Sequence, residues 1–194
     1  MKREAMAAMV MLLLAAQAAV AADVPALIEA GRQFYQKGDI ARAAHQLETA
    51  LADLQDRLGR GLSDDMPPIP AGWQGEDTEV QGLGAVGGGL SVTRAYTKGE
   101  ASLNASLILD SPAVDAAVAL FANPAADPTQ RRVKVEAEDA LLRWDATAHS
   151  GEITLVVANR ILLQIEGDNL LAADVLIDLA KGFNVGGMKK LIGV

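Results

Sequence analysis

Apolar residues recur at two different periods along this chain, and the change of period divides it into a helical part and a strand-rich part. Between residues 24 and 58 they fall three and four positions apart, as on one face of a helix. The longest such series is Ile40, Ala43, Ala44, Leu47, Ala50, Leu51, Leu54 and Leu58. We therefore expect two helices in residues 23–60, joined by a turn at Gly38-Asp39.

The next segment is rich in proline and glycine. Residues 61–72 hold Pro67, Pro68 and Pro70 and end on Gly72. Proline cannot continue a helix, and closely spaced prolines stiffen an extended chain. This pattern predicts that the second helix stops near Leu58 and that 61–72 form a semi-rigid linker or an extended lead into a second unit.

From residue 73 to 194 the apolar positions alternate, which is typical of strands. Alternation marks 90–96, 101–109, 131–136, 140–145, 153–158 and 161–166, and helices are expected at 112–122 and 170–181, the latter capped by Asp168-Asn169. Strands joined by such short turns are antiparallel. We predict an α+β sandwich with helices on one face and Trp73 and Trp144 in its core, Trp73 being partly exposed.

The first 22 residues have the three parts of a secretory signal peptide. Met1-Lys2-Arg3 is basic, 5–16 is apolar, and small residues precede Asp23. Cleavage is expected after Ala21 or Ala22, which predicts a periplasmic or secreted protein; an uncleaved anchor helix is the alternative. The apolar run falls short of the roughly 20 residues that span a bilayer.

Composition narrows the classes of function. The net charge is −8, and loss of residues 1–22 makes it more negative, so nucleic acid and anionic membrane surfaces are disfavoured as partners. The chain has no cysteine, which excludes disulfides, thiol chemistry and cysteine-bound metals. Aromatic residues make up 4%, too few for large stacking platforms.

Between Leu27 and Leu51 the chain resembles one tetratricopeptide repeat. Gly31, Phe34, the Gly38-Asp39 turn and the later Ala43, Leu47 and Ala50 stand at the repeat's small, aromatic, turn and packing positions. Leu27 replaces the early tryptophan, and no second copy follows. Because one repeat cannot bury its apolar face alone, the hairpin is expected to pack on the strand domain, on a second copy of itself or on a partner.

The strand domain, 73–194, is loosely similar in its order of elements to the α+β sandwiches of the PsbP/Mog1 type. Its cues are Pro-Ala-Gly-Trp at 70–73, the Asp-Ser-Pro helix start at 110–112 and the strand with Trp144. Domains of that type mostly serve in binding or assembly, so the resemblance implies such a role here.

None of the motifs that could indicate catalysis or cofactor binding has the form that such a site requires. Gly82 to Gly87 match a dinucleotide fingerprint, but an alternating strand follows where a helix is required, so a hairpin tip is expected. His45 has Glu48 at i+3, which fits a surface pair better than a metal site. No nucleophile elbow of the Gly-x-Ser-x-Gly type is present. The acidic runs at 64–65 and 136–139 lack the form of a calcium loop and are expected to be solvated surface or turn residues.

The leading hypothesis is therefore an exported, non-enzymatic protein that acts through protein contact or assembly, without a cofactor. Its partner would be an envelope protein or a second copy, and the candidate contact residues are Arg32, Tyr35, Gln36, Ala41, His45 and Glu48. The alternative is a carrier for a small apolar ligand or lipid between sheet and helices, near Ala101, Ala105 and Ala113. A third hypothesis is a carboxylate-based enzyme.

Overall fold

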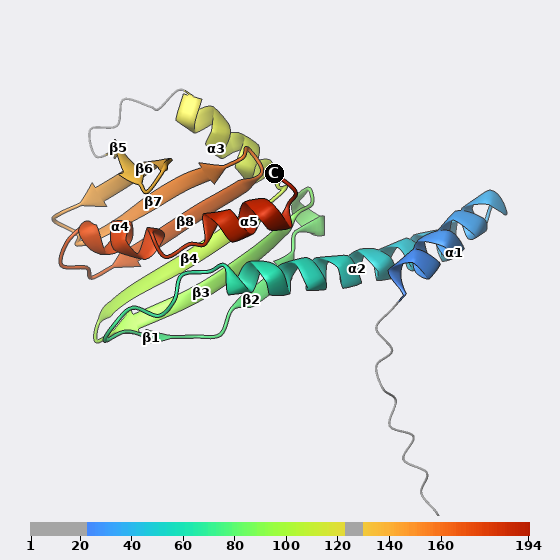
Figure 1. Ribbon diagram of the computed structural model, residues 1–194, viewed down its shortest axis with the longest axis horizontal. Helices are drawn as coiled ribbons and strands as arrows, with labels where there is room; N and C mark the ends of the chain where they lie inside the picture. Colours follow the sequence, from blue (N-terminus) through green and yellow to red (C-terminus); the bar gives the residue numbers. More distant parts are fainter. Residues whose placement is uncertain (1–22, 123–129) are drawn as a thin grey trace, which may run out of the picture. The chain divides into compact units, whose positions relative to one another are not determined.

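The computed structural model describes residues 23–122 and 130–194, so the expected signal peptide lies outside the described residues. The chain forms two compact units, one ending at Ala50 and one beginning at Leu51. Two helices come first, α1 (Val24–Gln36) and α2 (Ile40–Asp64), and a sheet with further helices follows (Figure 1). The predicted α+β arrangement is confirmed.

The first unit is a helical hairpin with a three-residue turn. Gly38 adopts a left-handed backbone (φ 77°), which an L-residue with a side chain rarely does, and Asp39 Oδ1 accepts a hydrogen bond from the Arg42 backbone N–H at 3.2 Å. Gly31 lets the two helices approach closely, because a Cβ there would lie 2.9 Å from the Leu47 side chain. The buried residues of the described hairpin are Val24, Gly31, Ala43 and Ala50.

The second unit is built on an eight-stranded antiparallel sheet. Its strands are β1 (Gln74–Gly75), β2 (Glu79–Gly82), β3 (Leu90–Lys98), β4 (Ala101–Leu109), β5 (Gln130–Val135), β6 (Glu138–Asp145), β7 (Ser150–Val157) and β8 (Ile161–Asp168). The spatial order is β1-β3-β4-β8-β7-β6-β5, and β2 also pairs with β3. The long strands begin and end within a few residues of the predicted ranges.

One face of this sheet forms the core. Its alternating positions on β3, β4, β7 and β8 are fully or almost fully buried, among them Leu90, Val92, Tyr96, Leu103, Leu107, Ile153, Leu155, Leu163 and Ile165. Helices α4 (Asp174–Ala180) and α5 (Val185–Leu191) cover it, and Figure 1 shows both in front of the sheet. Trp73 and Trp144 both pack against this core, but both are only partly buried, so Trp144 is as incompletely covered as Trp73.

The other face is polar over most of its area, but helices are not confined to one side as predicted. Helix α3 (Pro112–Ala122) covers part of it, where Val114 and Ala117 pack with Leu162, Ile108 and Val156. The register explains the difference, because Ile108, Leu162 and Val156 stand opposite one another on neighbouring strands and form an apolar patch on this face.

Helix α2 is longer than the sequence indicated. It was expected to stop near Leu58 but continues through Gly59 and Gly61 to Asp64. Leu62 is fully buried in the core, and a Cβ on Gly59 would lie 2.3 Å from the Val80 side chain. Close packing of this last stretch on the sheet unit therefore outweighs the weak helix propensity of glycine.

The proline-rich segment after α2 is anchored to the sheet. Pro67 is buried, and its carbonyl oxygen accepts hydrogen bonds from the Tyr96 hydroxyl at 2.7 Å and from Arg94 Nη1 at 3.2 Å. Met66, one residue earlier, is a core residue. The segment thus enters the sheet unit as part of its packed structure.

The C-terminal region departs furthest from prediction. The expected helix over 170–181 is shortened to α4, and α5 was not predicted. Asn169 does not cap α4, because its side-chain amide donates to the Glu100 carbonyl oxygen at 3.1 Å. Instead Asn184 caps α5 by accepting from the Gly187 N–H at 3.0 Å, and it donates to Asp65 Oδ1 at 2.7 Å.

Within the described ranges, 23–122 and 130–194, no helix is both long enough and apolar enough to cross a membrane.

Candidate functional site

The six predicted contact residues all lie on the exposed surface of the hairpin. Arg32 makes a two-armed ion pair with Glu29, at 2.8 Å for Nε–Oε2 and 2.7 Å for Nη2–Oε1. These hydrogen bonds, with another from Gln33, lower the pKa of Glu29 to about 2. Tyr35 is 68% exposed, and the remaining four, Gln36, Ala41, His45 and Glu48, are exposed as well.

These residues belong to the faces of two different helices. Arg32 and Tyr35 share a face of α1 with Ile28, at helical spacing, whereas Ala41, His45 and Glu48 share a face of α2. The α2 face lies beside the helix's apolar positions and does not contain them. The structure thus exposes all six side chains, three on α1 and three on α2, and their role in binding stays a prediction.

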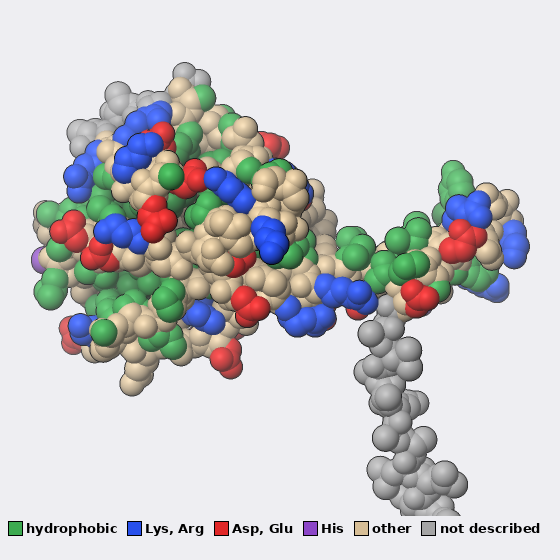
Figure 2. Space-filling view, in the orientation of Figure 1, with side chains coloured by type: hydrophobic (Ala, Val, Ile, Leu, Met, Phe, Trp, Pro, Cys, Tyr) green, Lys and Arg blue, Asp and Glu red, His purple; other side chains and the backbone are tan. Residues whose placement is uncertain are grey.

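The hairpin also exposes large apolar side chains that the list of six omitted. Ile28 is 47% exposed, Ile40 58% and Leu47 46%. Ile28 and Tyr35 lie one turn before and one turn after Gly31, and so flank its contact with Leu47. Figure 2 shows hydrophobic side chains at the surface of both α1 and α2. We call Ile28, Tyr35, Ile40 and Leu47 the hairpin patch.

A second candidate region is an apolar groove in the sheet unit. One hollow of about 350 Å³ is lined by Pro68, Pro70, Trp73, Leu103, Val175, Asp178, Leu179 and Gly182. A neighbouring hollow of about 390 Å³ shares Trp73 and Val175 with it and adds Lys98, Glu100, Ala101, Asn169, Leu170 and Leu171. The two hollows adjoin at these shared side chains, and we call them together the Trp73 groove.

The Trp73 groove differs from the ligand cavity that the carrier hypothesis requires. Both hollows are open to solvent, whereas a carrier is expected to enclose its guest. Of the three alanines expected near a guest, Ala101 lines the groove, Ala105 is fully buried and Ala113 is exposed on α3. The small side chains on β4 therefore contribute mainly to packing of the sheet and leave little space for a bound ligand.

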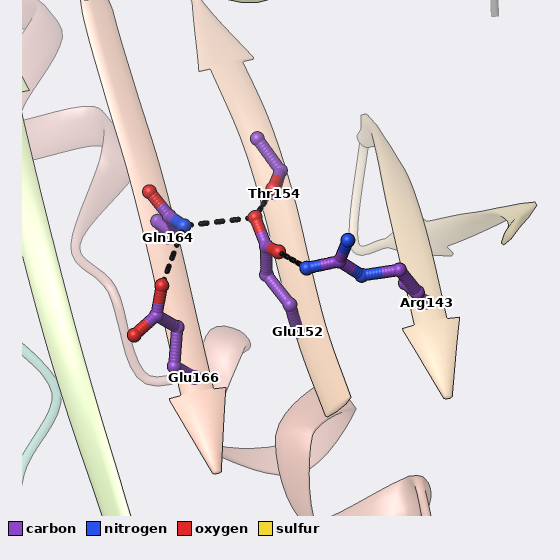
Figure 3. Close-up of polar contacts among 5 residues, drawn as sticks. All are labelled: Arg143, Glu152, Thr154, Gln164 and Glu166. Carbon is purple, nitrogen blue, oxygen red and sulfur yellow. Dashed lines mark hydrogen bonds and ion pairs between the residues drawn. The ribbon is translucent and has the colours of Figure 1, made fainter. Parts of the chain in front are cut away.

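A polar network on the opposite face is the third candidate (Figure 3). Gln164 Nε2 donates to Glu152 Oε1 at 2.8 Å and to Glu166 Oε1 at 3.0 Å, and so bridges two carboxylates on neighbouring strands. Glu152 also accepts from the Thr154 hydroxyl at 3.0 Å and pairs with Arg143. Antiparallel register positions these groups, because Glu152 stands opposite Glu166 and Thr154 opposite Gln164.

The network borders a polar hollow of about 370 Å³ at the ends of β6, β7 and β8. Asp145, Ser150, Glu152, Glu166, Asp168 and Arg143 supply its polar side chains, and Gly151 and Gly167 also line it. Backbone N–H groups of Ala148 and Thr147 donate to Asp145 and lower its pKa, so this carboxyl group stays ionised. An ionised acceptor does not act as a general acid. In the part of the chain that the structure describes, no three His, Asp or Glu side chains are arranged to hold a metal.

The remaining sequence motifs are structural. Gly84–Val86 form one 3₁₀ turn between the antiparallel strands β2 and β3, so the predicted hairpin tip is confirmed. His149 is exposed, with Nδ1 3.2 Å from the Leu170 carbonyl oxygen. Glu138 and Asp139 form ion pairs with Lys189 and Lys134, as expected of surface charges.

Two of these three regions were missed by sequence reasoning. The pairing of Glu152 with Glu166 depends on a three-residue turn, 158–160, because Val157 pairs with Ile161. The predicted strands 153–158 and 161–166 left only two residues between them, which shifts the register by one and places Glu152 opposite Gly167. The Trp73 groove joins segments distant in sequence, and no local pattern indicates it. No protein-family model matches the chain, and no curated protein or solved structure is detectably similar to it.

Proposed function

We propose that the chain is exported and acts in the periplasm or outside the cell as a non-enzymatic interaction or assembly protein. The hairpin patch is the proposed docking surface. Its partner is an envelope protein or a second copy of the chain. The basic start, apolar core and small residues of 1–22 support export.

One observation supports docking above the others. The hairpin buries Val24 and three small residues, yet leaves Ile28, Tyr35, Ile40 and Leu47 between 46% and 68% exposed. Scattered apolar residues on a surface are normal, but grouped ones mark interaction sites. The likeness of 27–51 to a single tetratricopeptide repeat supports the same proposal, because such repeats gain stability from a neighbour that covers them.

The chemistry of the described polar side chains favours binding over catalysis. In the network around Gln164, the Glu152 carboxylate already accepts two hydrogen bonds and an ion pair, which occupy three of its roughly four acceptor positions. A general base needs a free lone pair directed at its substrate. The open Trp73 groove gives the carrier hypothesis less support than an enclosed cavity would.

Site-specific photo-crosslinking in cells tests the docking proposal. A benzophenone amino acid in place of Tyr35 should give a defined adduct, whereas the same group in place of Val86, which is 65% exposed in the 3₁₀ turn, should not. The mass of the adduct distinguishes a second copy from another protein. Adducts of equal yield at both positions, or none at Tyr35, would contradict the proposed surface.

Cell fractionation with intact-mass measurement tests export. The mature protein should begin at Ala22 or Asp23 and be found outside the cytoplasm. A full-length chain in the cytoplasmic fraction would rule out the proposed location while leaving the crosslinking result to stand by itself.

A further inference from the structure

The Trp73 groove lies beside an unusually exposed leucine. Leu171 is 95% exposed, whereas its neighbour Leu170 is 1% exposed and belongs to the core. Leu171 also lines the larger of the two hollows, so a protruding apolar side chain and an apolar hollow adjoin on one surface. A leucine side chain in water forgoes the free energy that burial would provide.

The rim of the groove carries one charge of each sign. Lys98 is the last residue of β3 and Glu100 lies in the tight turn to β4, and both line the hollow next to Leu171. Among the ion pairs of the described residues, neither side chain has a partner. Asp178, which lines the other hollow, is already paired with Lys181 at 2.8 Å.

We propose that this surface is a two-fold symmetric interface between two copies of the chain. Leu171 of each copy enters the Trp73 groove of the other, and Lys98 of each copy faces Glu100 of the other. In a two-fold contact both subunits use the same patch, so the patch must carry both halves of every interaction. This surface does: it holds a protruding side chain with a hollow, and a cation with an anion.

Two features favour a second copy over an apolar small molecule. A guest in the groove would leave Leu171 in water, whereas dimerisation buries the Leu171 side chain of both copies. A guest without charge would also leave Lys98 and Glu100 unpaired. All residues of the interface lie within 51–194, so this inference is independent of the hairpin patch and of the proposed function.

The test is the oligomeric state of the mature chain, measured by analytical ultracentrifugation over a wide range of concentrations. The wild type should dimerise, and Leu171→Asp should weaken the dimer at least tenfold. Leu171 is almost fully exposed, so this change should leave the fold intact, which thermal melting at low concentration checks. Val86→Asp is the matched control, since Val86 is exposed but lies outside the groove, and it should dimerise like the wild type.

Charge reversal at Lys98 and Glu100 tests the proposed ion pairs between the two copies. Lys98→Glu and Glu100→Lys should each weaken the dimer, because each puts like charges face to face, and the double variant should restore it. A double variant as weak as either single variant would overturn the proposal.

Two further outcomes would also overturn it. One is a dimer that survives Leu171→Asp but is lost in Tyr35→Ala, which would assign self-association to the hairpin patch. The other is a wild type that stays monomeric throughout. If that monomer binds dodecanoate saturably, with a blue shift of Trp73 emission in a Trp144→Phe background, the groove takes an apolar guest instead.

Discussion

The hairpin and the sheet unit use the same kinds of apolar residue, alanine, leucine, isoleucine and valine, but bury them very differently. In the sheet unit Leu107, Ile153 and Leu163 are completely buried between the sheet and its helices. In the hairpin, Leu47 and Ile40 remain about half exposed. An amphipathic pattern thus predicts where a helix directs its apolar side chains, while a second layer decides whether those side chains leave water.

The largest effect is expected from a cavity in the core of the sheet unit. Leu163→Ala on the central strand β8 removes a completely buried side chain and should lower the free energy of unfolding by about 2–5 kcal/mol, measured by urea titration. Val86→Ala removes an exposed side chain and should change it by less than about 0.5 kcal/mol. Equal effects would mean that the sheet face is less tightly packed than described.

A smaller effect, confined to the hairpin, is expected at Gly31. Gly31→Val places a branched side chain against Leu47, where even a Cβ would lie at 2.9 Å, and should cost about 1–3 kcal/mol. Hydrogen exchange should show lost protection in α1 with little change in β4 and β8. Ala41→Val on the exposed surface of α2 controls for helix propensity; matching losses of protection in the sheet would show that the two units unfold as one.

The stability of the sheet unit should depend on pH through the carboxyl group of Asp65. Burial raises the pKa of this carboxyl group above 3.8, and the hydrogen bond from Asn184 offsets this only in part. Because the folded state disfavours the ionised form, stability should fall as the pH rises from about the unfolded pKa through the folded one. Asp65→Asn should remove this slope and be at least as stable as the wild type at neutral pH.

Denaturant titrations of both proteins over weakly acidic to neutral pH measure the Asp65 effect. A difference between them that does not change with pH, or one whose slope is reversed, would contradict it.

The smallest effect should come from the exposed ion pair of the hairpin. Arg32→Ala should raise the pKa of Glu29 from about 2 toward 4.5, as followed by NMR of its carboxyl carbon, with no measurable change in stability. Arg42→Ala removes a cation that pairs with Asp39 instead, and should leave Glu29 unchanged. If both changes shift Glu29 equally, the pairing of Arg32 with Glu29 is not specific.

Local patterns predicted the long elements and failed where packing decides. The strands β3, β4, β7 and β8 followed from alternation and turns, because each has one fully buried face. The last turns of α2 contain Gly59 and Gly61, and α5 contains Gly186 and Gly187, so propensity argued against helix in both places. Contacts with Val80, Leu191 and Asp65, distant in sequence, accompany the helical conformation there.

The candidate surfaces divide in the same way. The exposed positions of the hairpin could be found from helical spacing. The pairing of Glu152 with Glu166 was missed, because the predicted strands left two residues for a turn that has three. The Trp73 groove could not be found, because Pro68, Trp73, Lys98 and Leu171 are brought together by the order of strands in the sheet.

The pairing of β4 with β8, which we call the seam, joins segments far apart along the chain and should therefore form late in folding. Every other strand pair joins neighbours along the chain or segments close to it, but here Leu109 pairs with Ile161 and Ser102 with Asp168. The strands β1–β4 on one side and β5–β8 on the other can form early and separately. Closing the long loop that brings β8 beside β4 is expected to set the folding rate. Until the seam closes, β4 and β8 are unpaired strand edges, so a newly made chain is most prone to aggregation at that stage.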